Sequence, residues 1–261
     1  MIDIHSHVLY GVDDGAGTLE ESMAMLRIAA ESGTTDLVCT PHANLQYKFD
    51  PAEIRARLDR LSAAAGVSTG GAPRLHSGCD FHLSYDNIQD AIANPRKYTI
   101  AQQNYLLVEF SDMVVFHNTP EILARLEDAG MIPVITHPER NHLLRQRIEN
   151  IATWVDAGAR VQITAQSLLG EFGKRAQGFS ESLLERKLVH FVASDAHDCE
   201  RRPPRLDRAC EWLVKEHGER VARALCVENP KKTLTGEFLE PAEPEIAAPS
   251  KKWYQVWRKT N

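Results

Sequence analysis

The chain alternates short strand-like runs with helical segments over most of its length. Seven runs rich in apolar and β-branched residues are typical of buried strands, at residues 1–4, 36–40, 74–79, 105–110, 132–136, 159–164 and 189–194. Helical patterns separate several of these runs, at residues 19–32, 51–66, 119–130, 148–158 and 180–187. Strands that alternate with helices form parallel βαβ units. The alternation therefore predicts an α/β fold, either a barrel or a doubly wound sheet.

Local signals mark the ends of some of these helices. Thr18 precedes the first helix, and Glu21 lies three residues after Thr18, which is the spacing of a capping box. Gly130 and Gly158 follow two other helices, at the position where glycine commonly ends a helix. These signals support the helical assignment of the segments between the strands.

Composition narrows the class of protein. The chain has 261 residues, of which 43% are hydrophobic, and no apolar stretch approaches the roughly 18 residues of a membrane span. Its formal net charge of −6 argues against nucleic-acid binding, which favours a basic surface. The five cysteines show no CxxC spacing, and the N-terminus has no signal-peptide pattern. We expect a cytoplasmic protein with no nucleic-acid partner.

Histidines and carboxylates follow six of the seven predicted strands. In chain order they are His5 and His7, His42, Asp80, Glu109, His137, and Asp195 with His197. Side chains at the carboxyl ends of parallel strands meet on one face of a barrel and build its active site. Imidazoles and carboxylates gathered there are the ligands of a multinuclear zinc, manganese or iron site.

Each of these residues alone has an ordinary explanation. An HxH pair can be surface polarity, His42 can cap a helix, and Asp80 can be a helix N-cap. Glu109 and Asp195 are harder to explain in this way, because a carboxylate at the end of a central strand is buried and requires a partner. Eight such residues at equivalent positions favour a metal site.

The charges of this set indicate how many metal ions it would hold. Asp80, Glu109 and Asp195 carry three negative charges, and Asp14 adds a fourth. Two divalent ions would be nearly neutralised by the set, whereas three would leave a positive surplus. Such a surplus suits a bridging hydroxide and an anionic substrate such as a phosphate. We therefore expect three divalent metal ions.

The motifs taken together resemble those of the PHP (polymerase and histidinol phosphatase) superfamily. They are the N-terminal HxH, TPH after the second strand, HPER after the fifth and SDAH after the seventh. The stretches MIDIHSHVLYGVDDG and SDAHDCERRPP are similar to its bacterial branch of metal-dependent protein-tyrosine phosphatases. The resemblance covers residues 1 to about 235. It implies a single-domain, distorted (β/α)7 barrel like a TIM barrel, and a role in capsule and exopolysaccharide regulation.

The resemblance also implies three groups of metal ligands. The first group is His5, His7 and Asp195. The second is Glu109 and His137, with Asp80 bridging the first two metals. The third is Asp14, His42 and His197, with Asp13 as an alternative to Asp14. Manganese is the expected metal, and iron or zinc are alternatives.

Two arginines match the phosphate-binding arginines of the family. Arg140 lies in HPER and Arg202 lies in RRPP. Their planar guanidinium groups suit bidentate contact with phosphate oxygens, although an ordinary surface salt bridge is the alternative. In the mechanism that the family implies, a metal-bridging hydroxide attacks phosphorus directly, without a covalent enzyme intermediate.

One position departs from the family pattern. The family usually has Glu where this chain has Asp80, whose side chain is shorter by one methylene. We expect Asp80 still to coordinate, with the first two metal sites differing in affinity. His82 nearby could compensate, although a loop histidine explains it equally well.

A second phosphatase motif in the chain is a chance match. Cys199 and Arg205 fit the C-x5-R pattern of cysteine-dependent tyrosine phosphatases, in which backbone N–H groups cradle the phosphate. Pro203 and Pro204 lie inside this motif and have no N–H group to donate. We expect Cys199 to be dispensable for activity.

The expected substrate is a tyrosine-phosphorylated protein, such as the autophosphorylated tail of a membrane-associated bacterial tyrosine kinase. One alternative is a phosphatase of the same superfamily that acts on a small metabolite such as histidinol phosphate. Another is a metal-stabilised regulatory protein without turnover, which the presence of both Arg140 and Arg202 disfavours.

The strand and helix pattern stops near Glu237. We predict one phosphatase domain over residues 1–236, followed by a Pro-, Glu- and Ala-rich linker and a tail over 237–261. Trp253 and Trp257 are spaced by four residues among basic residues, as on one helix face. A disordered tail or an oligomer contact is the favoured interpretation, and weak docking on an anionic membrane or a partner is the alternative.

Overall fold

The computed structural model describes residues 1–68 and 73–239 of the chain. Within them, parallel strands form two sheets, with the orders β1-β2-β4 and β3-β5-β6-β7-β8-β9. The strands are β1 (Ile2–Ser6), β2 (Asp36–Cys39), β3 (His42–Ala43), β4 (Arg74–Ser77), β5 (Asp80–His82), β6 (Tyr105–Glu109), β7 (Ile132–Thr136), β8 (Arg160–Thr164) and β9 (Phe191–Ala193). The predicted α/β class and parallel pairing are confirmed.

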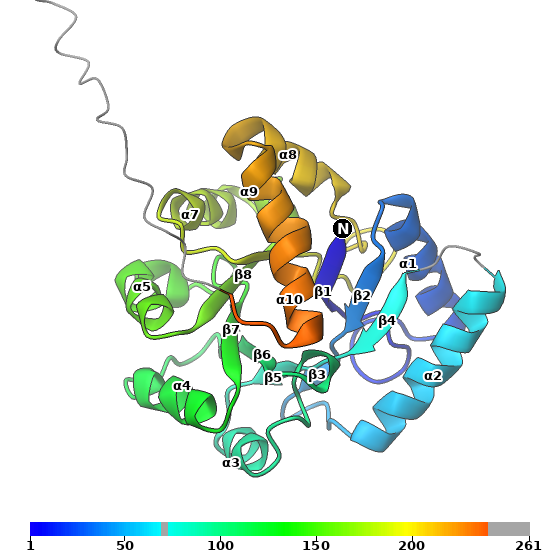
Figure 1. The fold of residues 1–261 in the computed structure, drawn as a ribbon, viewed down its shortest axis with the longest axis horizontal. Coiled ribbons are helices and arrows are strands. Elements are labelled where there is room, and N and C mark those ends of the chain that lie inside the picture. The colour runs from blue at the N-terminus through cyan, green and yellow to red at the C-terminus, as the bar shows by residue number, and fades with distance from the viewer. Residues whose placement is uncertain (69–72, 240–261) are drawn as a thin grey trace, which may run out of the picture.

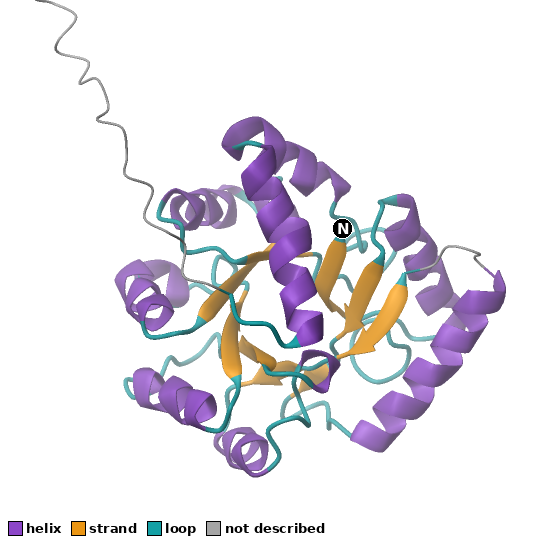
Figure 2. Cartoon of the chain, in the orientation of Figure 1, coloured by secondary structure: helices purple, strands orange, loops and turns teal. Residues whose placement is uncertain are grey.

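Helices surround these strands (Figures 1 and 2). The α-helices are α1 (Leu19–Glu31), α2 (Pro51–Ser68), α3 (Tyr85–Ala93), α4 (Thr119–Asp128), α5 (Ile148–Asp156), α6 (Ala165–Leu168), α7 (Lys174–Glu185), α8 (Asp207–His217), α9 (Glu219–Arg223) and α10 (Asn229–Thr235). Other helical segments are the 3₁₀-helical η1 (Ile100–Gln102) and η2 (Leu144–Gln146) and the π-helical η3 (Ala224–Glu228). All five predicted helical segments are present, and α3, α6, α8, α9 and α10 add to them.

All seven predicted strand runs are present, and the second and third are each followed, after a short break, by a further short strand that was not predicted. Pro41 separates β2 from β3, because proline has no N–H group to donate to a neighbouring strand. Gly78 lies between β4 and β5, and a Cβ atom there would come within 2.8 Å of Val38 Cγ1. The second and third runs therefore contain β2 and β4 of one sheet, and the strands β3 and β5 just beyond them belong to the other sheet.

The predicted helix ends are also present. The Thr18 side chain accepts a hydrogen bond from the Glu21 amide, and the Glu21 side chain accepts one from the Thr18 amide. Gly130 and Gly158 follow α4 and α5 with positive φ angles of 86° and 129°. The helix α7 begins six residues before the predicted range, because buried small residues continue its helical spacing ahead of the leucines.

Two clusters of buried apolar side chains hold the fold together. The larger one packs the helices against the strands. The smaller one joins side chains of β1, β6, β7 and β9, among them Ile4, Leu107, Val134 and Phe191, with Leu234 of α10 packed against it. In Figure 1 the helical segment from α9 to α10 crosses in front of the strands, beside the N-terminus. The polar side chains described below lie at the opposite, carboxyl ends of the strands.

The two ends of the strand series meet beside β1. A parallel bridge joins Ser6 to Ala196, just beyond β9. The His7 amide donates to the Ala196 carbonyl and the Asp195 amide donates to the His5 carbonyl, each over 2.8 Å. The N-terminal HxH motif and the SDAH motif are thereby held side by side.

The end of the described chain packs against the strands. The Tyr105 hydroxyl donates to the Glu237 carbonyl, and Arg160 donates to the Leu239 carbonyl. Residues 240–261, which include most of the predicted linker and tail, lie outside the described residues. Among the helices that the structure describes, none has both the length and the apolar character needed to span a membrane.

Candidate metal centre

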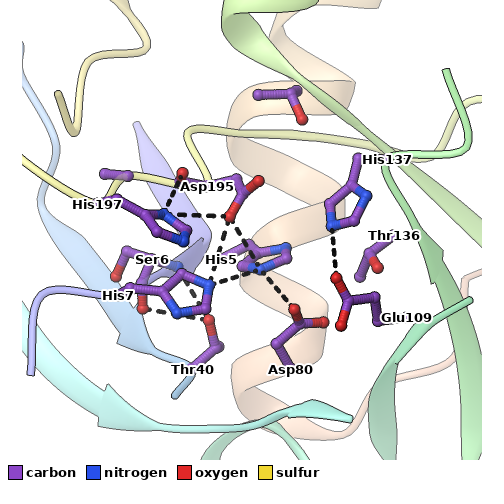
Figure 3. Close-up of polar contacts among 12 residues, drawn as sticks. His5, Ser6, His7, Thr40, Asp80, Glu109, Thr136, His137, Asp195 and His197 are labelled. Carbon is purple, nitrogen blue, oxygen red and sulfur yellow. Dashed lines mark hydrogen bonds and ion pairs between the residues drawn. The ribbon is translucent and has the colours of Figure 1, made fainter. Parts of the chain in front are cut away.

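The structure brings all nine predicted ligand side chains together. They come from the ends of six strand runs and from the loop after β1, and Figure 3 shows most of them converging. Four overlapping groups have ligand atoms within 4.8 Å of one another: His7–Asp14–His42–His197, His5–His7–Asp80, His5–His137–Asp195 and His42–Asp80–Glu109. The strand-end rule therefore placed the residues correctly, while their roles as ligands remain a prediction.

The first predicted group forms the buried centre of this cluster. The Nε2 atoms of His5 and His7 lie 3.3 Å apart, and each lies 3.4 Å from Asp195 Oδ1. Asp80 Oδ2 lies 3.7 Å from His5 Nε2 (Figure 3). The nitrogen and oxygen atoms of these side chains thus lie close together, in agreement with the first ligand group that the family resemblance implies.

The second predicted group is spread more widely. His137 Nε2 lies 4.0 Å from Glu109 Oε1, and His137 also groups with His5 and Asp195. Glu109 Oε2 lies 3.7 Å from His42 Nδ1 and 3.6 Å from His82 Nδ1. His82 therefore reaches Glu109, although it belongs to none of the four ligand groups.

The geometry of the third predicted group shows which of the two neighbouring aspartates, Asp13 or Asp14, faces the cluster. Asp14 Oδ1 lies 3.4 Å from His42 Nε2 and 3.6 Å from His197 Nε2. Asp13 Oδ2 instead lies 2.7 Å from His7 Nδ1 and accepts a hydrogen bond from the His42 amide. Asp14 is therefore the aspartate that faces the cluster, and Asp13 supports His7 from behind.

Gly15 allows this aspartate loop to pack closely against His7. A Cβ atom at Gly15 would lie only 2.0 Å from the His7 carbonyl oxygen, so no larger residue fits. The Gly15 amide donates to Asp13 Oδ1, and the Ala16 amide donates to the His7 carbonyl. The glycine of the DDG sequence thus fixes where the two carboxylates point.

Asp80 provides the clearest sign that the cluster fits a cation. Its side chain is fully buried, and neither carboxylate oxygen has a hydrogen-bond partner within the described residues. His42 Nδ1 lies 3.0 Å from Asp80 Oδ2, but it is not aligned for a hydrogen bond. A buried carboxylate without hydrogen bonds is unfavourable, whereas a divalent cation among these atoms would satisfy it. The donor set of imidazoles and carboxylates suits such an ion.

Outer contacts orient two of the histidines. His7 Nδ1 faces Asp13, and His5 Nδ1 lies 3.0 Å from Gln162 Oε1, so both Nε2 atoms face the cluster. Such contacts fix the tautomer of a metal-binding histidine. Gln162 was not predicted, although a glutamine in the middle of the apolar run of β8 is the sequence signal that could have revealed it.

Two residues of the cluster have strained backbones. His137 and Asp195 adopt φ angles of 33° and 51°, in the left-handed region that residues other than glycine rarely adopt. The amide of His137 donates to the Gln162 carbonyl, and that of Asp195 donates to the His5 carbonyl. Strain of this kind costs on the order of 1–3 kcal/mol and is concentrated at functional sites. It marks the same two strand ends that the sequence motifs mark.

The electrostatics of the cluster divide four of its histidines into two pairs. Burial opposes protonation of His7 and His42, but Asp13 raises the pKa of His7 to about 9, and Asp14 and Asp80 raise that of His42 to about 11. Burial lowers the pKa of His137 and of His197 to about 3. Without metal, two histidines therefore hold protons at neutral pH, which an incoming metal ion must displace.

Both predicted arginines lie at this cluster and share one carboxylate oxygen. Arg140 and Arg202 each donate to Asp195 Oδ2, the latter over 2.6 Å. Burial raises the pKa of Asp195, but His5 and the arginines more than offset this and hold the pKa well below its usual range. The arginine side chains are 25% and 22% exposed, so they are accessible at the edge of the cluster.

The C-x5-R motif forms no site of its own. Arg205 forms an ion pair with Asp207. Cys199 lines a cavity of about 570 Å³ together with Asp14 and His197, and burial raises the pKa of its thiol. A thiol that stays protonated is a poor nucleophile, which agrees with the prediction that this motif arose by chance.

Comparison with known proteins places the chain in a family. The profile described as "Capsular polysaccharide synthesis, CpsB/CapC" matches residues 1–235. The chain belongs to the CpsB/CapC family. Tyrosine-protein phosphatase YwqE of Bacillus subtilis (strain 168) is 35% identical over 247 residues, which are 94% of this chain and 96% of YwqE. Tyrosine-protein phosphatase CpsB of Streptococcus pneumoniae is 29% identical over 244 residues, which are 92% of this chain and 100% of CpsB.

Solved structures agree with this CpsB/CapC membership. A crystal structure from work on YwqE of Bacillus subtilis and CpsB of Streptococcus pneumoniae, described as metal-dependent tyrosine phosphatases, matches with a TM-score of 0.86 and 34% identity. The match covers 92% of this chain and 96% of the other. The lactonase Lmo2620 of Listeria monocytogenes, with a TM-score of 0.59 and 10% identity over 91% of this chain and 95% of the lactonase, shares the fold alone.

Proposed function

We propose that this chain is a metal-dependent phosphatase that hydrolyses phosphotyrosine in proteins. The observation that carries the proposal is the buried Asp80 carboxylate, which lacks hydrogen bonds and lies among histidines at the strand ends. Two arginines beside this cluster supply positive charge for a phosphate group. Membership of the CpsB/CapC family supports phosphotyrosine as the substrate class.

The proposed cofactor is a set of three divalent ions, with manganese first and iron or zinc as alternatives. The first two sites comprise His5, His7, Asp195, Glu109 and His137, with Asp80 shared between them. The third comprises Asp14, His42 and His197. When bound, such ions supply hydroxide at neutral pH and offset negative charge on the phosphate.

The residues of the chain have separate tasks in this reaction. The guanidinium groups of Arg140 and Arg202 bind the phosphate oxygens and stabilise the charge that develops on them. Asp13 and Gln162 hold His7 and His5 with their Nε2 atoms toward the reacting centre. Because the leaving tyrosine phenolate has a free pKa of about 10, the reaction depends less on a strong general acid than hydrolysis of an alkyl phosphate does.

The surroundings of the cluster suit a protein substrate better than a small metabolite. The Asp14 side chain is 50% exposed, so the cluster is open to solvent on that side. A cavity of about 570 Å³ adjoins Asp14 and His197, and another of about 300 Å³ adjoins His82 and Glu109. A phosphotyrosine on a protein needs such an open approach, whereas histidinol phosphate would suit a deep, closed pocket.

The proposed partner is a membrane-associated bacterial tyrosine kinase that controls capsule or exopolysaccharide synthesis. The proposed location is the cytoplasm, where the phosphorylated tail of such a kinase would be found. The name of the matching family, capsular polysaccharide synthesis, supports this biological setting. The basic, tryptophan-containing segment at the end of the chain would add weak docking to the membrane or the kinase.

We also infer that the seven strand runs form a single (β/α)7 barrel and that residues 1–236 are one domain. Two observations support a barrel. The chain passes from one parallel sheet to the other between β2 and β3 and again between β4 and β5, and the Ser6–Ala196 bridge joins β1 to the segment after β9. A barrel in this register would place every proposed ligand at one rim.

Phosphate release from two substrates tests the proposed activity. A tyrosine-phosphorylated peptide and histidinol phosphate are compared with manganese and with a chelator, using wild type, Arg140→Ala and the surface control Asp128→Asn. We expect release from the peptide that chelation abolishes, a large loss in Arg140→Ala and wild-type rates in the control. Preference for histidinol phosphate would overturn the substrate class. No release from either substrate by the metal-bound protein would support a non-catalytic regulatory protein.

A further inference from the structure

Phe172 contacts both arginines of the proposed phosphate site. Arg140 Cζ lies 4.5 Å from the centre of the Phe172 ring, and Arg202 Cζ lies 6.0 Å from it. A cation within about 6 Å over an aromatic face is attracted by the negative charge of that face. One ring therefore lies against two like-charged groups that also share Asp195 Oδ2.

The backbone around Phe172 is shaped for this contact. Phe172 lies between α6 and α7, in the loop that follows the carboxyl end of β8. Gly170 and Gly173 flank it with φ angles of 77° and 86°, which other residues rarely adopt. The Gly173 amide donates to the Gly170 carbonyl over 2.9 Å and closes the turn that carries the ring.

Side-chain hydrogen bonds tie this loop to the segment that contains Arg202. Gln166 Nε2 donates to the Arg201 carbonyl over 2.6 Å and to Glu171 Oε2 over 2.8 Å. Glu171 Oε1 in turn accepts a hydrogen bond from Arg208. These bonds tie the residues on the N-terminal side of Phe172 to the segments before and after Arg202, and none of them involves a residue of the metal cluster.

We infer that Phe172 is a positioning residue that keeps Arg140 and Arg202 together for phosphate binding. This inference rests on the proposed function, because it takes the two arginines as the phosphate site. The two guanidinium groups repel each other, and the Asp195 Oδ2 atom accepts hydrogen bonds from both of them. A bound phosphate would compete with Asp195 for the same N–H donors, and the two arginines would then lose the contact that holds them together. The aromatic face attracts both cations without competing for their N–H donors, which stay available to the phosphate.

A double-mutant cycle on phosphate binding tests the inference. The variants are Phe172→Leu, which keeps an apolar side chain without the ring, Arg140→Ala and the combination of both. Binding of inorganic phosphate to the manganese-loaded protein is measured by calorimetry. We expect Phe172→Leu to weaken phosphate binding roughly 3- to 30-fold, in line with the range of cation–π energies. In the Arg140→Ala background the same substitution should have a much smaller effect.

Further variants separate positioning from structural support. Phe172→Tyr keeps the ring and should restore phosphate binding to near wild type. Phe238→Leu, at a phenylalanine that is 70% exposed, is the matched control and should change nothing. A fall in melting temperature with unchanged phosphate binding in Phe172→Leu would overturn the inference. An equal effect of Phe172→Leu with and without Arg140 would overturn it as well.

Kinetics with a phosphotyrosyl peptide distinguish this inference from the proposed activity. We expect Phe172→Leu to raise KM and the inhibition constant for phosphate by similar factors, with a smaller change in kcat. A rise in KM alone would mean that the ring contacts the peptide, against the inference. If the wild-type protein releases no phosphate from the peptide, the proposed activity fails, and the calorimetric cycle still decides the role of Phe172.

Discussion

Replacing Asp80 by asparagine tests whether the buried cluster binds metal. Asparagine keeps the size of the side chain and removes its negative charge. Asp80 belongs to two of the four ligand groups, one with His5 and His7 and one with His42 and Glu109. The substitution is therefore expected to weaken two metal sites instead of one.

The size of the effect follows from ligand linkage. A metal ion present at 100 times its dissociation constant stabilises the folded protein by about 2.7 kcal/mol, so two sites contribute about 5 kcal/mol. In a protein of this size each kcal/mol shifts the melting temperature by about 2 to 4 °C. We therefore expect Asp80→Asn to lose roughly 10 to 20 °C of the rise in Tm that manganese gives the wild type.

The assay is thermal unfolding of chelator-treated protein with and without manganese. Asp128→Asn, at an exposed carboxylate at the end of α4, is the matched control and should keep the full rise. Asp80→Glu retains the charge and should keep most of it. A full manganese-dependent rise in Asp80→Asn would refute the reasoning, because Asp80 would then make no contact with a metal.

Three further predictions follow from the contacts around the cluster. Cys199→Ser should release phosphate at the wild-type rate, and loss of activity with intact metal content would contradict the metal-dependent mechanism. Asp13→Asn should weaken metal binding about 10- to 100-fold by calorimetry, because it removes the negative charge beside His7 Nδ1, and unchanged affinity would assign that charge no such role. In metal-free protein the pKa of His7 is raised from 6.5 to about 9, so the stability it contributes is present below pH 6.5 and lost as pH rises through about 9. The Tm of chelated protein should therefore fall over this interval while that of manganese-loaded protein does not, and a chelated Tm that stays constant would argue against the raised pKa.

The sequence could predict the gathering of the cluster because one geometric rule controls it. Carboxyl ends of parallel strands meet on one side, so a histidine or carboxylate after a strand needs no further information to be placed there. Glu109 and Asp195 were identified on this basis, since a buried strand end leaves a charge without solvent. The parallel α/β class followed from a separate rule, that strands alternating with helices form parallel βαβ units.

Other features depend on contacts that spacing does not encode. Whether Asp13 or Asp14 faces the cluster is decided by the close packing of Gly15 against the His7 carbonyl. Gln162 contacts His5 across 157 residues of sequence, and Phe172 reaches the arginines from a glycine-flanked loop. Gln162 lies in β8, and Phe172 lies in the loop region beyond it. The predicted run that contains β8 is the one run whose end carries no histidine or carboxylate of the cluster.

The two oxygens of Asp195 face different parts of the site, and this division bears on turnover. Oδ1 lies at the histidine cluster, while Oδ2 accepts hydrogen bonds from Arg140 and Arg202. In the proposed reaction, an incoming phosphoryl group and the departing inorganic phosphate must both compete with this resident carboxylate for the same donors. This competition weakens the binding of both the phosphoryl group of the substrate and the inorganic phosphate product. The substrate gains further contacts through its peptide, whereas free phosphate does not. Asp195 would thus hasten product release, so that a strongly cationic site is not blocked by its own product.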